Sequence, residues 1–309
     1  MTRVLVLLAA LGAAVAAHAQ QPSPSPPVFS AETEAVNVTV TVRDAKGNLV
    51  RDLTRADFEV LEEGRPQEIQ IFARAFDPGQ DQTLALDLGM LLDTSESMLK
   101  ELKLSQEAAV RFLESVPRAR ELITIFFDEE IRLSRYDSEN QQGLMDRIHA
   151  AKGGGNTALY DAIAVYLSRV QDATGRKVLV IFSDGEDSRS SLNLDEVMRL
   201  IRSGSVSIYS IAFTGGFRPG APNAFKARAF LQQVADMTGG QVYTPQSSGD
   251  LAGIYRKILE ELEAQYVLGF SSSGAPDGQF RRLRVNVKRP GLKVRHRPGY
   301  KRFAPEPPS

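Results

Sequence analysis

The sequence predicts an α/β protein in which a doubly wound, mostly parallel sheet is accompanied by a small β domain formed by the two flanks of the chain. Three observations predict this fold class. The middle of the chain contains nearly all-apolar runs of strand length, and helical patterns separate them. Strands that alternate with helices indicate a parallel sheet covered on both faces. The segments on either side show the apolar–polar alternation of half-buried strands.

The first 19 residues are predicted to be a signal peptide. Arg3 begins a short positive end, an apolar run covers residues 4–17, and Ala17-His18-Ala19 has the A-x-A form of a cleavage site. The apolar run is shorter than the about 20 residues that span a bilayer. Residues 20–30 are a Pro/Ser linker, and we find no transmembrane segment in the mature chain. We therefore expect an exported protein, periplasmic or extracellular.

The composition of the whole chain is that of a globular protein and excludes several kinds of chemistry. The chain has 309 residues, a formal net charge of -1 and 42% hydrophobic residues. This is enough for one large domain or two smaller ones. The sequence contains no cysteine, which excludes disulfides, zinc–thiolate sites and thiol catalysis. An exported chain without disulfides must be held by its hydrophobic cores.

Residues 31–78 are predicted to form an N-terminal β segment. Valines at every second position from Val36 to Val42 alternate with polar residues, as in a half-buried strand. The turn sequence "DAKGN" follows, and Thr54 and Asp57 are spaced to cap one helical turn. The stretch "FEVLEEGRPQEIQIF" indicates two further strands joined by a turn at 63–66.

Residues 84–263 are predicted to form the parallel α/β domain. The run "TLALDLGMLLD" is nearly all apolar, as expected of a strand buried on both faces. Further buried strands are expected at 122–127, 177–184 and 206–213. The helical patterns lie at 99–115, 140–150, 157–171, 193–203, 224–238 and 247–263.

Residues 264–302 are predicted to be a C-terminal β segment, and 303–309 a tail. The stretches "QYVLGF", "FRRLRVNVK" and "LKVRHRPGY" alternate, with Leu283, Val285 and Val287 on one face. Neither flank is large enough for its own core, so we expect the two to pair into one β domain. Their charges are compatible with pairing. Residues 31–70 contain nine acids and five bases, whereas residues 281–302 contain ten Lys/Arg and no acid.

A cluster of small oxygen donors follows the buried strands of the central region. Asp93, Ser95 and Ser97 come directly after the first strand, Asp184 ends the strand "KVLVIFSD", and Thr157 lies where a glycine-rich loop meets a helix. Parallel α/β sheets bind ligands at the carboxyl ends of their strands. An all-oxygen set suits Mg²⁺ or Mn²⁺ and suits zinc or copper poorly. Two carboxylates also leave the ion able to accept another carboxylate from outside.

The sequence here resembles the von Willebrand factor type A (VWA) family, which has a Rossmann-like fold. The shared pattern is Asp93-x-Ser95-x-Ser97, then Thr157 after the glycine-rich loop, then Asp184 in "SDG". The resemblance implies a metal-ion-dependent adhesion site. Ser95, Ser97 and Thr157 would contact the ion, Asp93 and Asp184 would bind it directly or through water, and a partner's Asp or Glu would complete the coordination. The flanks also resemble secreted bacterial VWA-related proteins of the acidobacterial type, in "VRDAKGNLVRDLTRADFEVLEEG" and "VKRPGLKVRHRPGY".

Each of these residues also has a purely structural interpretation. Asp93, Ser95 and Thr157 are residue types that cap helices, and Ser183-Asp184-Gly185 has the composition of a turn. The whole set in order on the expected elements favours the metal site. We interpret three further acids near these loops as caps, supporting residues or solvated residues: Asp128, Asp161 and Asp187.

Two rival functions remain open. Asp93-Thr94-Ser95 superficially resembles a phosphatase motif, but the position of the second acid is Ser95, and only His149 and His296 remain after the signal is removed. We expect no enzymatic activity. The basic stretch "RRLRVNVKRPGLKVRHRPGYKR" is the second rival, because it has the charge to bind an envelope polyanion. We expect it instead to be a solvated or internally paired face, and we expect no nucleic-acid ligand.

The function predicted from the sequence is a non-catalytic, exported protein-interaction or adhesion module. It would bind an Asp or Glu carboxylate of a partner protein through Mg²⁺ or Mn²⁺ at Asp93, Ser95, Ser97, Thr157 and Asp184. No pattern of the sequence identifies this partner, because the partner supplies the last ligand. The sequence does not indicate the oligomeric state either.

Overall fold

The computed structural model describes residues 35–75, 85–116, 119–136, 141–171, 175–213, 222–272 and 274–303. The predicted signal peptide (1–19), the linker (20–30) and residues 304–309 of the predicted tail lie outside the described residues. None of the helices in the described part has the length and apolar character needed to cross a membrane.

The central region is built on a six-stranded sheet with the strand order β10-β9-β8-β5-β6-β7. Its strands are β5 (Leu86–Asp93), β6 (Glu121–Phe127), β7 (Ile131–Tyr136), β8 (Arg176–Ser183), β9 (Val206–Ala212) and β10 (Val242–Tyr243). All neighbouring pairs are parallel except β6 and β7, which are antiparallel. Every residue of β5 is buried, because this strand lies mid-sheet with both faces covered.

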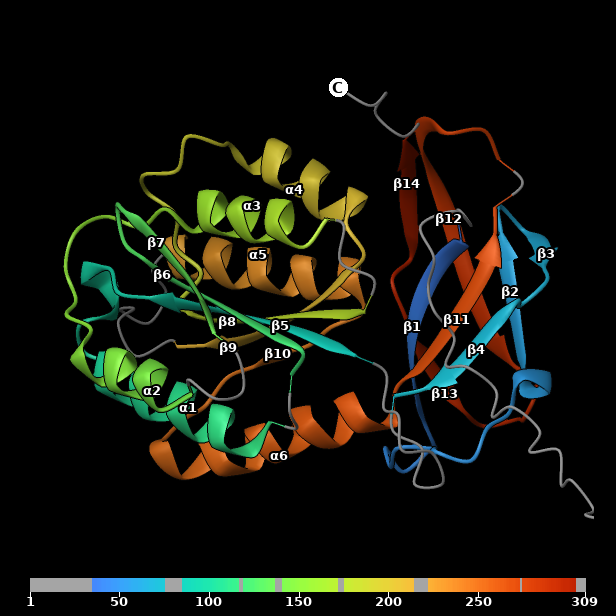
Figure 1. Ribbon diagram of the computed structural model, residues 1–309, viewed down its shortest axis with the longest axis horizontal. Coiled ribbons are helices and arrows are strands. Elements are labelled where there is room, and N and C mark those ends of the chain that lie inside the picture. The colour runs from blue at the N-terminus through green and yellow to red at the C-terminus, as the bar shows by residue number, and fades with distance from the viewer. Residues whose placement is uncertain are drawn as a thin grey trace, which may run out of the picture.

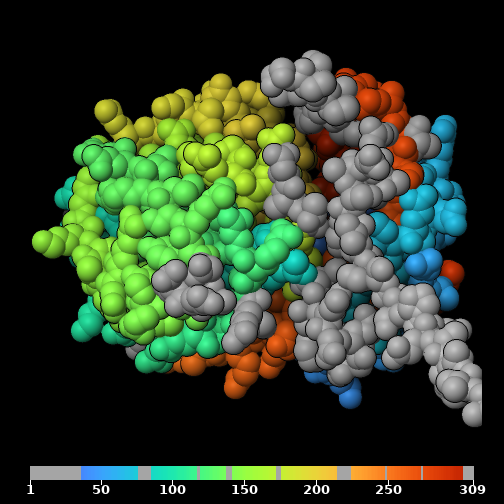
Figure 2. All heavy atoms as spheres, viewed as in Figure 1, coloured from blue at the N-terminus to red at the C-terminus, as the bar shows by residue number. Residues whose placement is uncertain are grey.

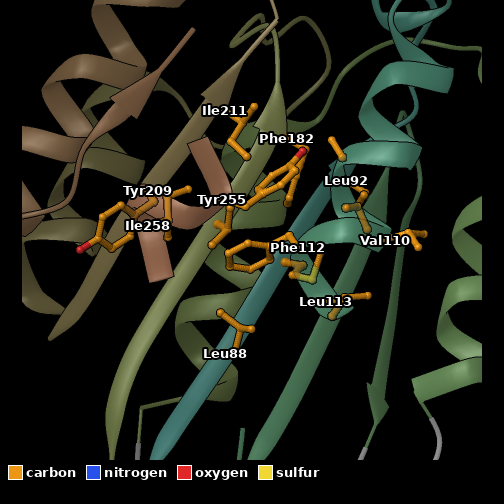
Figure 3. Packing of buried hydrophobic residues seen from close by; sticks show 14 of the residues in the cluster. Leu88, Leu92, Val110, Phe112, Leu113, Phe182, Tyr209, Ile211, Tyr255 and Ile258 are labelled. Atoms are coloured by element: carbon orange, nitrogen blue, oxygen red, sulfur yellow. The ribbon is translucent and has the colours of Figure 1, made fainter. Parts of the chain in front are cut away.

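Helices cover both faces of this sheet (Figure 1). One layer consists of α1 (Leu102–Ser115), α2 (Gln141–Ala150) and α6 (Ser248–Ala264), and the other of α3 (Leu159–Arg169), α4 (Leu194–Ser203) and α5 (Pro222–Thr238). The helical period brings the apolar side chains of α1 to one side, where Phe112 packs against Phe182 and Tyr255, with ring centroids 6.3 Å and 5.9 Å apart (Figure 3). The two apolar layers are formed wholly by residues between Leu86 and Leu262.

The two flanks of the chain form a β-sandwich beside the central region (Figures 1 and 2). One sheet has the order β13-β1-β11-β4 and the other β14-β12-β2-β3. The N-terminal flank supplies β1 (Ala35–Arg43), β2 (Phe58–Glu62), β3 (Arg65–Gln67) and β4 (Ile71–Arg74), and the C-terminal flank supplies β11 (Tyr266–Ser271), β12 (Asp277–Val287), β13 (Lys293–Arg295) and β14 (Gly299–Phe303). Each sheet therefore contains strands of both flanks, and the predicted fold class is confirmed.

The register explains why the flanks need each other. Val38 lies opposite Leu268, and Val60 opposite Val285, so each pair joins an N-terminal strand to a C-terminal one. The alternation of β1 buries Val38 completely between the two sheets. The core of the sandwich consequently draws its apolar side chains from both ends of the chain.

The structure differs from the sequence-based expectation at three strands. β7 was not predicted, because it is an edge strand of partly buried residues without an apolar run. β10 has only two residues. The stretch expected as one strand after the turn at 63–66 is divided into β3 and β4, which belong to different sheets. After Gln67 the chain no longer pairs with β2 and pairs with β11 instead. There the backbone N–H of Gln70 donates a hydrogen bond to the carbonyl oxygen of Gly269.

The sandwich contacts the end of the central sheet at which the parallel strands begin. Arg297 donates hydrogen bonds to the carbonyl oxygens of Gly204, just before β9, and of Asn37 in β1, at 3.1 Å and 2.9 Å. The fully buried Glu261 of α6 accepts hydrogen bonds from Arg43 and Tyr209 at 2.9 Å and 2.5 Å, and it also pairs with Arg295. The opposite end of the sheet, at which β5 and β8 end, therefore faces away from the sandwich (Figure 1).

Replacing Glu261 with alanine is expected to lower the free energy of unfolding by about 2–4 kcal/mol. The change removes the anionic partner of two arginines and the acceptor of the buried Tyr209 hydroxyl, and breaking a buried ion pair is costly. The side chains of Arg43 and Arg295 are 32% and 30% exposed, which lowers the cost. Urea unfolding measures the effect. The control is Glu263→Ala in the same helix, which removes an exposed ion pair with Arg51. It should lower the free energy of unfolding by less than about 1 kcal/mol. Equal costs for the two variants would contradict this account of the junction.

Candidate metal-binding site

Asp93, at the end of β5, is fixed by contacts on both sides. One carboxylate oxygen accepts a hydrogen bond from the backbone N–H of Ser95 at 3.0 Å, and the other accepts one from the hydroxyl of Ser183 at 2.5 Å. The residue is 1% exposed. The carboxylate thus joins the end of β5 to the end of β8.

The two serines of the motif lie at the start of a 3₁₀ turn, η2 (Glu96–Met98), which contains Ser97. Ser95 is the residue before this turn, and its side chain makes no capping hydrogen bond. The hydroxyl oxygens of Ser95 and Ser97 are instead 3.1 Å apart. A capping role therefore does not account for the positions of these hydroxyls, which are gathered beside Asp93.

The glycine-rich loop is bonded to both neighbouring loops. The carbonyl of Gly155 accepts a hydrogen bond from Glu96 N at 3.0 Å, and the φ of Gly155 is 77°, which favours glycine. On the other side, Thr157 N donates to the hydroxyl of Ser188 at 3.0 Å, and Thr157 O accepts from the backbone of Ser188 at 2.9 Å. Thr157 is 4% exposed, and Ala158 rather than Thr157 is the N-cap of α3.

Asp184 follows β8 and has one unpaired oxygen. Its Oδ1 accepts the backbone N–H of Glu186 at 2.9 Å, which is the turn interaction that the sequence also allowed. Its Oδ2 is buried and has no hydrogen-bond partner in the described part of the chain. The φ of Gly185 is 86°, and a Cβ there would lie 2.7 Å from the carbonyl oxygen of Ala227, so glycine allows this turn to approach α5.

The electrostatics of the two carboxylates reflect their burial and proximity. Burial, and then the charge of Asp184, raise the pKa of the Asp93 carboxyl to about 7. Burial also raises the pKa of Asp184, and the N–H of Glu186 and the hydroxyl of Ser97 partly oppose that effect. The negative charges of two buried carboxylates repel each other, and a cation bound beside both would remove this repulsion.

The acids interpreted as caps or supporting residues have those roles in the structure. Asp128 pairs with Arg132 at 2.5 Å and accepts a hydrogen bond from Thr94. Asp187 accepts the backbone N–H of Tyr160 in α3 at 3.1 Å. Asp161 accepts the backbone N–H groups of residues 191 and 192 at 2.7 Å and 3.0 Å. These contacts fasten the loops that carry Asp93, Thr157 and Asp184.

Sequence reasoning missed two positioning residues, Ser183 and Ser188. Ser183 holds Asp93, and Ser188 holds the backbone of Thr157. Ser183 directly precedes Asp184 in "FSDG", and its side chain points to the same end of the sheet because it is the last residue of a buried strand. No local sequence pattern indicates the role of Ser188, because it and Thr157 are 31 positions apart in the chain.

Comparison with known proteins decides the family. The family model of the von Willebrand factor type A domain matches residues 87–257, more than half of the chain. The chain belongs to the von Willebrand factor type A domain family. Its VWA region contains all the residues assigned to the metal site, from Asp93 to Asp184, and the resemblance inferred from the sequence is thereby confirmed for this region. The resemblance of the flanks stays a prediction.

Several solved structures are similar to this VWA protein. The von Willebrand factor type A protein from Catenulispora acidiphila has 12% identity and a TM-score of 0.49, over 89% of this chain and 76% of that one. The conserved hypothetical protein BatB from Bacteroides thetaiotaomicron has 15% identity and a TM-score of 0.44, over 56% and 97%. The vWF domain of the type V pili tip protein Mfa5 from Porphyromonas gingivalis has 12% identity and a TM-score of 0.45, over 57% and 96%. No curated protein matched the sequence.

The donor set of the site fits a hard divalent cation. Its side chains are two carboxylates and three hydroxyls, without sulfur or imidazole, and one buried carboxylate oxygen has no partner in the described segments. Within the described ranges, no group of three or more His, Cys, Asp or Glu side chains is arranged to hold a metal. The candidate site differs from such a group, because it has only two carboxylates and its other three donors are hydroxyls. Metal binding by these five residues stays a prediction.

In metal-free protein, we expect the stability contributed by Asp93 to be lost as the pH rises. A pKa raised from 3.8 to about 7 in the folded state favours folding fully below pH 3.8, and this contribution disappears as the pH rises through about 7. The loss is on the order of a few kcal/mol, because a tenfold difference in proton affinity corresponds to about 1.4 kcal/mol. Urea unfolding in EDTA at several pH values should show a flatter profile for Asp93→Asn than for the unmodified protein. Parallel profiles would show that Asp93 does not titrate in this way.

Proposed function

We propose that this protein is a non-catalytic interaction module that binds an acidic side chain of a partner protein through Mg²⁺ or Mn²⁺. The observation that carries the proposal is the buried Oδ2 of Asp184, which has no hydrogen-bond partner among the residues that the structure describes. It lies on an edge where Asp93 is also buried and the hydroxyls of Ser95 and Ser97 are in contact. An unpaired buried carboxylate oxygen is costly unless something else satisfies it. A bound cation would satisfy it.

The charge balance of the site supports a role in binding a carboxylate. Asp93 and Asp184 together would neutralise a divalent ion, and the hydroxyls of Ser95, Ser97 and Thr157 add no charge. When bound, the ion would act as a Lewis acid that accepts one more oxygen from outside. The residues of this chain would hold it in place through the contacts of Asp93 with Ser95 and Ser183.

The position of the site also supports an interaction with another molecule. The sandwich packs at the end of the sheet where the strands begin, so it does not cover the loops that carry Asp93 and Asp184 (Figure 1). The export of the protein remains part of the proposal, because it depends on the N-terminal sequence and on the lack of a spanning helix in the described residues.

The histidines give no support to a catalytic role. His296 accepts a hydrogen bond from Val285 N at 3.1 Å inside the sandwich, and burial lowers its pKa. His149 is exposed near the end of α2. In the described part of the chain, neither imidazole is hydrogen-bonded to a serine or threonine hydroxyl, which a nucleophile activated by histidine would require.

The rival role of the basic C-terminal segment is weakened by internal pairing. Arg281 pairs with Asp277, Arg282 with Glu63, Arg289 with Asp52, and Arg295 with Glu261. Two of these four partners belong to the N-terminal flank. Four of the ten Lys and Arg residues at 281–302 thus pair within the chain, as the charge balance of the flanks led us to expect.

The function is tested by capturing partners from a cell-envelope extract with the immobilised mature protein. We expect a protein retained in Mg²⁺, released by EDTA, and not retained by Asp184→Asn. Asp236→Asn, on the exposed face of α5, is the matched control and should retain it. Retention that ignores EDTA but falls steeply with salt would favour the polyanion function and contradict our proposal.

The identity of the metal is a separate prediction. All-oxygen, partly hydrated coordination should favour Mg²⁺ and Mn²⁺, with weak affinity until a carboxylate joins. We expect titration calorimetry in acetate to show binding of Mg²⁺ and Mn²⁺ that is lost in Asp184→Asn. Tight zinc binding that the same substitution abolishes would overturn the assignment.

A further inference from the structure

A groove of about 1020 Å³ lies between the sandwich and the ends of two helices, remote from the metal site. Its walls come from β12, β2 and β14 of one sandwich sheet and from Arg202 and Met237, near the last turns of α4 and α5. Both helices run toward the sandwich, away from the end of the central sheet at which β8 ends (Figure 1). Asp184 directly follows β8, so the groove and the metal site lie at opposite ends of the sheet.

The groove is strongly positive. Four cationic side chains line it, against the single carboxylate of Glu63. Arg282 is already paired with Glu63 at 2.9 Å. In the part of the chain that the structure describes, the other three have neither an ion pair nor a hydrogen bond: Arg202, Arg284 and Lys301. Arg284 and Lys301 come from the C-terminal strands β12 and β14, and Arg202 comes from α4, so the groove gathers unpaired cations from both parts of the molecule.

Apolar side chains lie among these cations on the same outer face of the sheet. Phe280 is opposite Lys301 in the register of β12 and β14, and Leu61 is opposite Arg284 in that of β12 and β2. The ring of Phe280 lies over Gly299, where a Cβ would come within 2.3 Å of its edge, and it remains 41% exposed. Glycine at this position therefore allows an aromatic wall that is open to a ligand.

We propose that this groove binds an acidic, partly apolar peptide segment of another protein. Charge complementarity requires carboxylates for the unpaired cations, and the exposed ring of Phe280 and the side chain of Leu61 offer contact area to apolar side chains between them. The cations surround a concave space between two parts of the molecule, which suits an extended chain better than the flat surface of a membrane. This second binding site does not depend on the metal.

The test is fluorescence anisotropy with a labelled peptide in which glutamates alternate with leucines. EDTA is present throughout, so that the metal site contributes nothing. We expect saturable binding by the full mature protein and none by a peptide with glutamines in place of glutamates. The double variant Arg284→Glu/Lys301→Glu should raise the Kd about tenfold or more. Phe280→Ala should raise it to a smaller extent.

The matched control is Lys103→Glu/Lys257→Glu, which makes the same charge change at exposed lysines of α1 and α6. It should leave the Kd unchanged. Equal losses in the two double variants, equal binding of the glutamine peptide, or no binding of the acidic peptide would overturn the proposal. So would anionic phosphatidylglycerol vesicles that bind through Arg284 and Lys301 while the peptide does not. Circular dichroism of each variant checks that these surface changes leave the fold intact.

Discussion

Deleting residues 266–309 is expected to unfold the N-terminal flank and leave the central sheet folded. The deletion removes β11, which lies between β1 and β4, and β12, which lies between β14 and β2. Val38 and Val60 then lose the residues opposite them, Leu268 and Val285. The flank that remains has too little core to fold alone. Hydrogen exchange should therefore show loss of protection at Val38 and Val40, while β8 stays protected because its two apolar layers are intact.

A point variant keeps this prediction testable if the truncated chain aggregates. Gly269, in the middle of β11, is packed so closely that a Cβ would lie 2.8 Å from Ile71 and 2.8 Å from the side-chain oxygen of Asn37. Gly269→Val should loosen β1 and β4 together, without touching the central sheet. Gly143→Val, whose Cβ would meet nothing within 4 Å on α2, is the control for the added side chain. Unchanged protection at Val38 in both the truncated chain and Gly269→Val would show that the flanks fold separately.

Asp184→Asn is expected to abolish metal-dependent partner binding while leaving the fold in EDTA as stable as before, or slightly more stable. The substitution keeps the acceptor for Glu186 N and removes the charge that raises the pKa of Asp93. Thr157→Val keeps the shape of the side chain and removes one oxygen donor, so it should weaken binding without unfolding. Asp93→Ala should cost more stability than Asp184→Asn, because Ser95 N and the Ser183 hydroxyl lose their acceptor.

The comparison of melting temperature with partner binding separates the two roles of these residues. Residues that hold a metal should affect binding in Mg²⁺ far more than melting in EDTA. A sharp fall in melting temperature in EDTA for Asp184→Asn and Thr157→Val would mean that they are structural caps. Partner binding that survives both substitutions would also contradict the adhesion-site interpretation. Asp187→Ala provides a useful contrast, because it removes the acceptor of Tyr160 N in α3 and should therefore lower stability before it affects partner binding.

The parts of the fold that local patterns encode were predictable. β5 and β8 are mostly apolar because they are covered on both faces, and β1 alternates because only one face is buried. The expected pairing of the flanks followed from their size and charge. Strands without such a signature were missed, namely the half-exposed β7 and the two-residue β10.

The candidate site was predictable only as far as its residues follow strands. Asp93 and Asp184 are placed by the ends of β5 and β8, and the family pattern supplied Thr157. The unpaired Oδ2 of Asp184 and the contact of Ser183 with Asp93 depend on how loops meet in space, over a separation of 90 positions in the second case. The groove could not be predicted from sequence patterns either, because Arg202 and Lys301 are brought together by the packing of the sandwich on α4.

The most direct test of the central claim is the anomalous scattering of manganese in crystals of the mature protein grown with Mn²⁺ and acetate. We expect a peak beside the hydroxyls of Ser95 and Ser97 and the carboxylate of Asp184, and no peak there in crystals of Asp184→Asn. If the well-ordered site of the unmodified protein shows no manganese peak under these conditions, or the peak is unchanged in Asp184→Asn, these residues do not form the metal site and the account is wrong.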